Sequence, residues 1–191
     1  MKWWLALLFV CSTVVATAGD AYLMPRDQFE RFRNRRGPRG EGSCVYASIS
    51  MCGAHHGVPS AEFLLENHPT YGPAVLDGSW PERVERDMAS RKVPVAIWNV
   101  EGSQTPDWID WALDRGCYVA ITYGEGHMIT AVGRDGADYL LVDNNFPGEV
   151  RRVTRDTFLR EHRRHGGGWC VILQTAGPPP WARAQYPRGR Q

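Results

Sequence analysis

The chain has 191 residues, 43% of them hydrophobic, and a formal net charge of +1. This length is enough for one domain whose core needs no disulfides to hold it together. The nearly balanced charge gives no global field that would attract nucleic acid or an anionic membrane surface. We therefore predict no nucleic-acid partner.

The first eighteen residues have the pattern of a secretory signal peptide. Lys2 supplies a positive charge, residues 3–15 form an apolar run, and Ala16-Thr17-Ala18 is a small-x-small cleavage site. The apolar run is too short for a membrane span. We expect cleavage after Ala18, no stable membrane insertion, and a mature protein that is secreted or otherwise outside the cytoplasm, in a periplasm or at a cell surface.

Two segments are predicted to lie outside the domain, which we expect to span residues 40–175. Residues 19–39 contain the arginine-rich stretch RDQFERFRNRRGPR and are expected to form a solvated or partly disordered leader. Docking of residues 31–39 on an anionic cell wall or nucleic acid is a minor alternative, because no aromatic stacking platform accompanies the arginines. Residues 176–191 are rich in proline and arginine without periodicity, so we expect a disordered tail.

The first half of the domain has the spacing of helices. In residues 44–56, apolar residues recur at helical intervals, with Ser43 as the N-cap and Gly57 as the stop. Further helices are predicted over residues 61–67, 81–92 and 106–116. A strand is predicted over residues 93–100, where Pro94 is tolerable near the start of a strand.

The second half reads mainly as strands. They are predicted over residues 117–123, 127–135, 138–144 and 168–174, with a helix over 154–162 before the last one. Arg134-Asp135-Gly136 marks a hairpin turn between two of these strands. Helices followed by antiparallel strands indicate an α+β fold.

Four cysteines remain after the signal peptide. Cys44 falls in the first turn of its helix, where the helix dipole and free backbone N–H groups favour the reactive thiolate. Cys52, Cys117 and Cys170 stand among apolar neighbours and are interpreted as buried small hydrophobes, with one disulfide among them as the alternative. No CxxC pair is present, so we predict no zinc site and no other metal or cofactor.

A catalytic thiol needs a base, and His127 is the candidate. It follows Gly126 at the start of an apolar strand. The next strand of the hairpin ends in Asp143-Asn144, sixteen residues on. Because a hairpin brings the end of its second strand beside the start of its first, a polar group lies where it can fix the tautomer of His127.

The order of these motifs resembles the papain-like cysteine peptidase superfamily, and within it the peptidase domains of bacteriocin-processing exporters and their free-standing relatives. That family has a helix ending in glycine, a strand, Gly-His, a strand with V-G-x-D-G, and a strand ending in Asp. The corresponding segments here are LDRG, CYVAITY, Gly126-His127, VGRDG and LLVD, and GGWCVILQ resembles the family's last strand. The resemblance covers residues 40–175.

Two departures from that family concern the site. The family has a glutamine six residues before the cysteine as an oxyanion-hole donor, whereas this chain has Pro38 there and its only upstream glutamine in the mature chain is Gln28. Loss of one such donor typically costs ~10²–10³ in rate. In addition, Asp143 is followed by Asn144 rather than proline. Asp143 matches the exporter-type aspartate, whereas Asn144-Asn145-Phe146 is similar to papain's Asn-Ser-Trp, so Asp143 is preferred as the orienting residue and Asn144 is the alternative.

The resemblance implies a secreted thiol hydrolase that cleaves peptide or amide bonds through Cys44, His127 and Asp143 or Asn144. Two alternatives stay open. An acyltransferase of the transglutaminase type uses the same three residue types, and an inactive binding module is favoured by Pro38 at the donor position.

Overall fold

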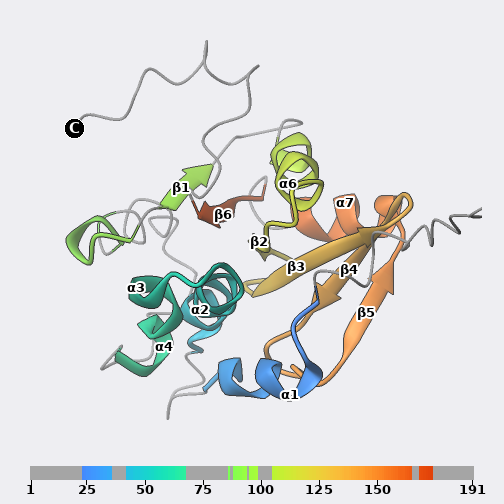
Figure 1. Cartoon of the computed structure of the whole chain (residues 1–191). Helices are drawn as coiled ribbons and strands as arrows, with labels where there is room; N and C mark the ends of the chain where they lie inside the picture. Colours follow the sequence, from blue (N-terminus) through green and yellow to red (C-terminus); the bar gives the residue numbers. More distant parts are fainter. Residues whose placement is uncertain are drawn as a thin grey trace, which may run out of the picture.

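A computed structural model describes residues 23–35, 42–67, 86, 88–93, 95–98, 105–164 and 168–173 (Figure 1). The predicted signal peptide, the loop around residues 70–80, most of the helix predicted after Pro81, and the C-terminal tail lie outside these ranges. Residues 86 and 88–90 of that helix are described and are helical.

The described strands form one antiparallel sheet in the order β1-β6-β2-β3-β4-β5. The last described strand therefore lies inside the sheet, between β1 and β2. The bounds are β1 (Val95–Trp98), β2 (Val119–Thr122), β3 (Met128–Asp135), β4 (Asp138–Val142), β5 (Val150–Val153) and β6 (Cys170–Leu173).

Five of the six strands fall within the predicted ranges, and β5 was not predicted. Its sequence is Val-Arg-Arg-Val, with both arginines exposed, and it occupies an edge of the sheet. A short edge strand with charged side chains protects the sheet against pairing with another chain, but it lacks the apolar alternation that marks a strand in the sequence.

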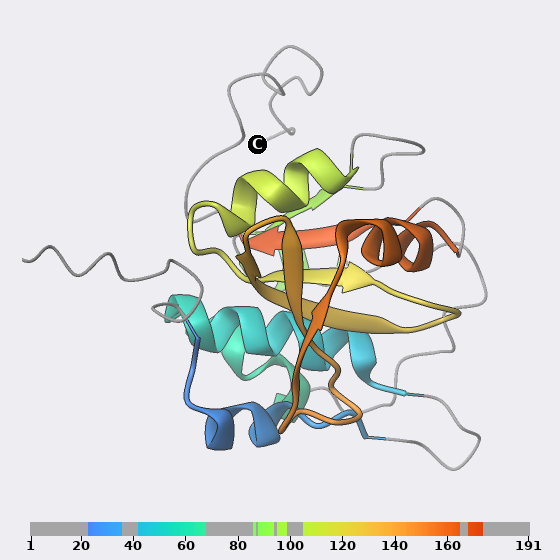
Figure 2. The same cartoon turned by 90° about the vertical axis from the view of Figure 1, so that its right-hand side faces the viewer.

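Helices cover both faces of the sheet (Figure 2). On one face lies α2 (Cys44–His56), which contacts β2, β3 and β6. The short helices α3 (Pro59–Glu62) and α4 (Leu64–Asn67) pack against α2. On the other face lie α6 (Thr105–Leu113) and α7 (Arg155–Arg163). The predicted α+β fold is confirmed, although α6 and α7 interrupt the run of strands.

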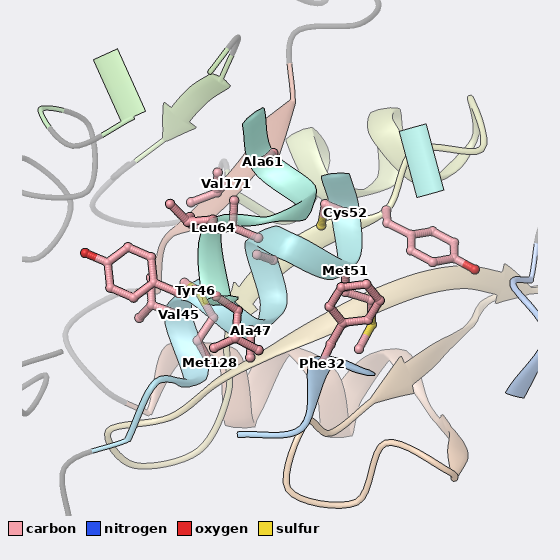
Figure 3. Close-up of a cluster of buried hydrophobic side chains, with 14 of the residues drawn as sticks. Phe32, Val45, Tyr46, Ala47, Met51, Cys52, Ala61, Leu64, Met128 and Val171 are labelled. Atoms are coloured by element: carbon pink, nitrogen blue, oxygen red, sulfur yellow. The ribbon is translucent and has the colours of Figure 1, made fainter. Parts of the chain in front are cut away.

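The core on the α2 face is built around this helix, whose residues 44–53 are all buried (Figure 3). Such a helix lies inside the domain rather than on its surface. Gly53 allows the close approach of α3, because a Cβ there would lie 2.3 Å from the backbone nitrogen of Glu62. The helix ends as predicted, at Gly57 with a φ of +61°.

The core on the opposite face joins α6 and α7 to the sheet. Trp108 of α6, Tyr139 of β4 and Phe158 of α7 are all fully buried, and the rings of Tyr139 and Phe158 stack with centroids 3.9 Å apart. Arg155 and the Tyr139 hydroxyl both donate to Asp110, which ties α6, α7 and β4 together. With a buried core on each face, the sheet is held rigidly between the helices.

The arginine-rich leader differs from the expectation. Residues 26–32 form α1 (Arg26–Phe29) and the 3₁₀ turn η1 (Glu30–Phe32), and Phe29 and Phe32 are buried in the core beside α2. The described arginines of this segment, Arg26, Arg31, Arg33 and Arg35, are exposed, as predicted. Because two aromatic side chains alternate with charged ones, the segment packs on the domain while its charges stay in water.

Two local details also differ from the sequence-based expectations. The helix predicted over residues 61–67 is broken at Phe63 into α3 and α4. Ser43 stands at the N-cap of α2, but its hydroxyl accepts a hydrogen bond from the Arg35 backbone at 3.0 Å instead of capping the helix. Within the described ranges, no helix has the length and apolar character needed to cross a membrane.

Candidate active site

Cys44 is the first residue of α2, as the sequence predicts. The N–H groups of a first helical turn have no acceptor within the helix, and the dipole there favours negative charge. The residue is 4% exposed. The helix geometry therefore places the thiol beside backbone N–H groups at the positive end of the helix dipole.

His127 lies at the end of the loop that joins β2 to β3. The Tyr123 backbone N–H donates to the His127 carbonyl at 3.0 Å, which closes the loop, and Gly126 has a φ of +62° that other residues adopt only under strain. The side chain of His127 is 21% exposed. The imidazole is thus partly shielded from water and fixed by a rigid hairpin.

Asp143 meets the imidazole directly. Its Oδ1 lies 2.9 Å from Nε2 of His127 and also accepts the Asn145 backbone N–H at 2.9 Å. A further hydrogen bond, from the Phe146 backbone to the Asp143 carbonyl at 2.7 Å, shapes the turn after β4. The carboxylate is therefore held in place by its own loop while it accepts from the ring.

Cys44, His127 and Asp143 act on one another electrostatically. Burial opposes a charge on His127, but hydrogen bonds to Asp143 and Cys44 and the charges of both groups outweigh it and raise the pKa of His127 to about 9. Burial raises the pKa of Asp143, but hydrogen bonds from His127 and the Asn145 backbone, together with the charges of His127 and Arg151, outweigh it, so the net shift of this pKa is downward. Since Nε2 faces Asp143, the other ring nitrogen, Nδ1, is the one left for Cys44.

Asn144 does not join this group. Its side chain is fully buried, and its Nδ2 lies 2.8–3.0 Å from the Cys44 carbonyl, the Ser48 hydroxyl and the Met128 carbonyl. It links α2 to β3 behind the site, so its geometry is that of a structural bridge. The structure brings together the thiol, the imidazole and the aspartate, and it turns the alternative orienting residue away from the ring.

Two residues near the imidazole, Asn145 and Asn34, were not among the catalytic residues predicted from the sequence. Asn145 places its Nδ2 3.1 Å from Nε2 of His127, and its Oδ1 accepts from Asn34 at 2.9 Å. Asn34 belongs to the arginine-rich segment and lies 111 positions away from Asn145 in the chain. A contact over such a separation leaves no periodicity or motif in a single sequence, so no local signal identifies it.

The backbone N–H of Cys44 is available as one oxyanion-hole donor. Among the described residues, the positions considered from the sequence supply no second one. Pro38 lies outside the described residues, and Gln28 is exposed on α1. In the part of the chain that the structure describes, no cluster of three or more His, Cys, Asp and Glu side chains is suited to hold a metal ion. None of the four described cysteines forms a disulfide and all four are buried, which agrees with the interpretation of Cys52, Cys117 and Cys170 as small hydrophobes.

Comparison with known proteins gives structural matches only. No known family model and no curated sequence matches the chain. One matching structure is a double glycine motif protease from an AMS/PCAT transporter in complex with its leader peptide, at 18% identity and a TM-score of 0.46, covering 69% of this chain and 85% of that one. Another is the peptidase domain of Streptococcus ComA, a bi-functional ABC transporter of a quorum-sensing pathway, at 16% identity and a TM-score of 0.43, covering 75% and 99%. In its structure, the chain is similar to the peptidase domains of these two transporters.

Proposed function

We propose that the protein is a cysteine hydrolase that cleaves peptide or amide bonds. The observation that carries the proposal is the alignment of a first-turn cysteine, an imidazole within hydrogen-bonding reach of it, and a carboxylate on the far side of the ring. Each of the three residue types also occurs in structural roles. Their convergence from α2, the β2–β3 loop and the β3–β4 hairpin is what favours catalysis.

The roles follow from the geometry. The Cys44 sulfur attacks the substrate carbonyl, and its proton resides on His127, whose raised pKa keeps the imidazolium present at neutral pH. The imidazolium then protonates the leaving amine as the C–N bond breaks and a thioester forms. Water attacks the thioester and gives a proton to His127, and the carboxylic acid is released together with the Cys44 thiolate, which restores the starting thiolate–imidazolium pair. Asp143 orients the ring and stabilises its charge.

The first test is hydrolysis of a peptide library by the full chain and by Cys44→Ala. We expect Cys44→Ala to fold and to retain less than about one per cent of the activity, because alanine is a good helix former but has no nucleophile. Cys52→Ala is the matched control: it lies two turns further along the same helix, inside the core, and should keep its activity. Activity that survives in Cys44→Ala would place the nucleophile elsewhere.

The second test is alkylation by iodoacetamide at pH 6. Cys44 has an imidazolium partner, whereas burial raises the pKa of Cys52 and Cys170. We expect Cys44 to be modified at least ~10-fold faster than the other cysteines, because the thiolate is the reacting form. Equal and slow labelling of all four would instead support an inactive binding module.

A further inference from the structure

Nε2 of His127 has two neighbours with opposite hydrogen-bonding character. Asp143 Oδ1, at 2.9 Å, is an acceptor and favours a proton on Nε2. Asn145 Nδ2, at 3.1 Å, is a donor and favours a lone pair there. One ring nitrogen satisfies only one of these demands at a time, so the two side chains compete over the same proton.

The direction of the Asn145 amide is fixed by a relay of hydrogen bonds that starts at a backbone group. The Ser43 N–H donates to Asn34 Oδ1 at 2.8 Å, and a backbone N–H can only donate. The other end of the Asn34 amide is therefore its NH₂ group, which donates to Asn145 Oδ1 at 2.9 Å. The NH₂ group of Asn145 is consequently the end that faces His127.

Further contacts hold this relay between the N-terminal segment and the loop after β4. The Asn34 backbone N–H donates to the Asn144 carbonyl at 2.7 Å, and the Arg33 guanidinium donates to the Asn145 carbonyl at 3.1 Å. Gly42 leaves room for the Asn34 amide, since a Cβ there would lie 3.1 Å from its nitrogen. The relay thus connects the start of the nucleophile's helix to the far side of the imidazole.

We propose that Asn145, oriented by Asn34, is a positioning residue that opposes protonation of Nε2 and so limits how strongly His127 holds its proton. The proposal rests on the proposed function, in which that proton must pass to a leaving amine. A histidine held between a carboxylate and a thiolate binds its proton tightly, and proton transfer is most efficient when the pKa lies near the working pH. A hydrogen bond donated by the Asn145 amide lowers the pKa of His127 toward the working pH without adding a charge.

The charged and titratable groups that act on the ring come from two elements. Asp143 acts from the loop after β4, and Cys44 acts from α2. Arg151 of β5 acts on Asp143 in turn. Because Cys44 itself raises the pKa of His127, the effect of Asn145 on this pKa is best measured when the thiol is absent.

The experiment is an NMR titration of the His127 ring in the full chain carrying Cys44→Ala, with His127→Gln used to assign the signals. We expect Asn145→Ala to raise the pKa of His127 by about 0.5–1 unit, since a neutral hydrogen bond to the uncharged form is lost. Asn34→Ala keeps Asn145 but frees its amide to turn, so it should also raise this pKa. Gln28→Ala, on the same N-terminal segment but exposed, should leave it unchanged.

The sign of the shift separates the relay from a merely structural role. If Asn145 only supported the loop, its loss would loosen Asp143 and lower the pKa of His127. A fall, or no change, in both Asn145→Ala and Asn34→Ala would overturn the proposal. The ring nitrogen-15 shifts above the pKa give a second readout, because the relay predicts a larger share of the Nε2–H tautomer in both variants. None of these measurements uses turnover, so failure of the proposed hydrolase activity would show separately, as hydrolysis that persists in Cys44→Ala.

Discussion

At each end of α2 a cysteine of the helix is combined with histidine. His127 comes from the β2–β3 loop at one end, and His55 and His56 belong to the helix at the other; their pKa values shift in opposite directions. At the N-terminal end, Cys44 is paired with His127, whose pKa rises to about 9. At the C-terminal end, Cys52 is followed by His55 and His56, and burial together with the neighbouring His55 lowers the pKa of His56 to about 4. Burial also raises the pKa of the Cys52 thiol.

The dipole of α2 favours the opposite result at its C-terminal end, where cations are stabilised. Burial prevails there, and no carboxylate of the described residues acts on His55 or His56. The pKa of His55 is lowered by burial despite its 2.7 Å hydrogen bond to the Gly116 carbonyl, and its ring stacks on Tyr118 with centroids 3.7 Å apart. At the other end, Asp143 and Cys44 together outweigh the burial of the imidazole, and the hydrogen bond to Asp143 is the largest of their contributions. The anionic partners of a histidine, rather than its position beside the helix, therefore decide whether it is charged.

The largest predicted effect comes from removing the histidine at each end of α2. His127→Ala should lower hydrolysis by at least ~10³-fold, because the general acid and base is lost. His55→Ala should leave turnover within about twofold. The His55 ring packs on Tyr118 at the opposite end of α2 from Cys44 and does not contact His127. Peptide hydrolysis at pH 7 measures both variants.

Combining changes tests whether the N-terminal end acts as one unit. The double variant Cys44→Ala/His127→Ala should be no worse than either single variant, because residues that act together are not additive. A double variant that is far less active than each single one would contradict the pairing of these two residues.

The next effect in size concerns Asp143, the group that distinguishes the two ends. Asp143→Ala should lower turnover by about 10²–10⁴-fold and lower the pKa of His127. In the wild type, the imidazolium loses its proton as the pH rises through about 9, so the alkaline limb of the pH–rate profile should lie there. In Asp143→Ala that limb should move to lower pH.

Asn144→Ala is the matched control for Asp143→Ala. Its loss leaves the Cys44 and Met128 carbonyls without the buried amide that bridges them, so we expect a destabilisation of about 1–3 kcal/mol in denaturant unfolding. The alkaline limb should stay in place, because Asn144 does not touch the ring. A larger shift of the limb in Asn144→Ala than in Asp143→Ala would reverse the assignment.

The sequence was sufficient to predict the elements that carry the site, because each has a strong local signal. The helix over residues 44–56 has helical apolar spacing and a terminal glycine, and the hairpin around Gly136 has a turn signature; both are observed. The arginine-rich segment was read by its charge, whereas Phe29 and Phe32 determine its packing. Edge strand β5 lacked the alternation that predicts a strand.

The choice between Asp143 and Asn144 needed the structure, because it depends on a β-bulge. The β3–β4 register shifts by one residue between Ala131 and Gly133, so that Thr130 rather than Ala131 lies opposite Val142. A shift of one residue exchanges the side chains that share a face. Continued past the last pair, the shifted register puts His127 on the same side as Asp143 and Asn145, whereas a hairpin without the bulge would put it on the side of Asn144.

The smallest predicted effect is the pH dependence of stability at the C-terminal end of α2. A histidine whose folded pKa lies below its ordinary value of 6.5 stabilises the fold above pH 6.5, and this contribution is lost as the pH falls toward 4. His56→Gln should therefore lose less stability than the wild type between pH 7 and pH 5, by about 1 kcal/mol. Denaturant unfolding at the two pH values measures the difference.

His127→Gln supplies the opposite slope and completes the comparison. The pKa of His127 is raised, so its contribution is fully present below pH 6.5 and is lost as the pH rises toward 9. Its replacement should flatten the alkaline side of the stability curve and leave the slope between pH 7 and pH 5 as it is, whereas His56→Gln should flatten that slope and leave the alkaline side unchanged. If both variants flattened the same side, the pKa values of His127 and His56 would be shifted in the same direction. The role assigned to the Asp143 carboxylate would then be wrong.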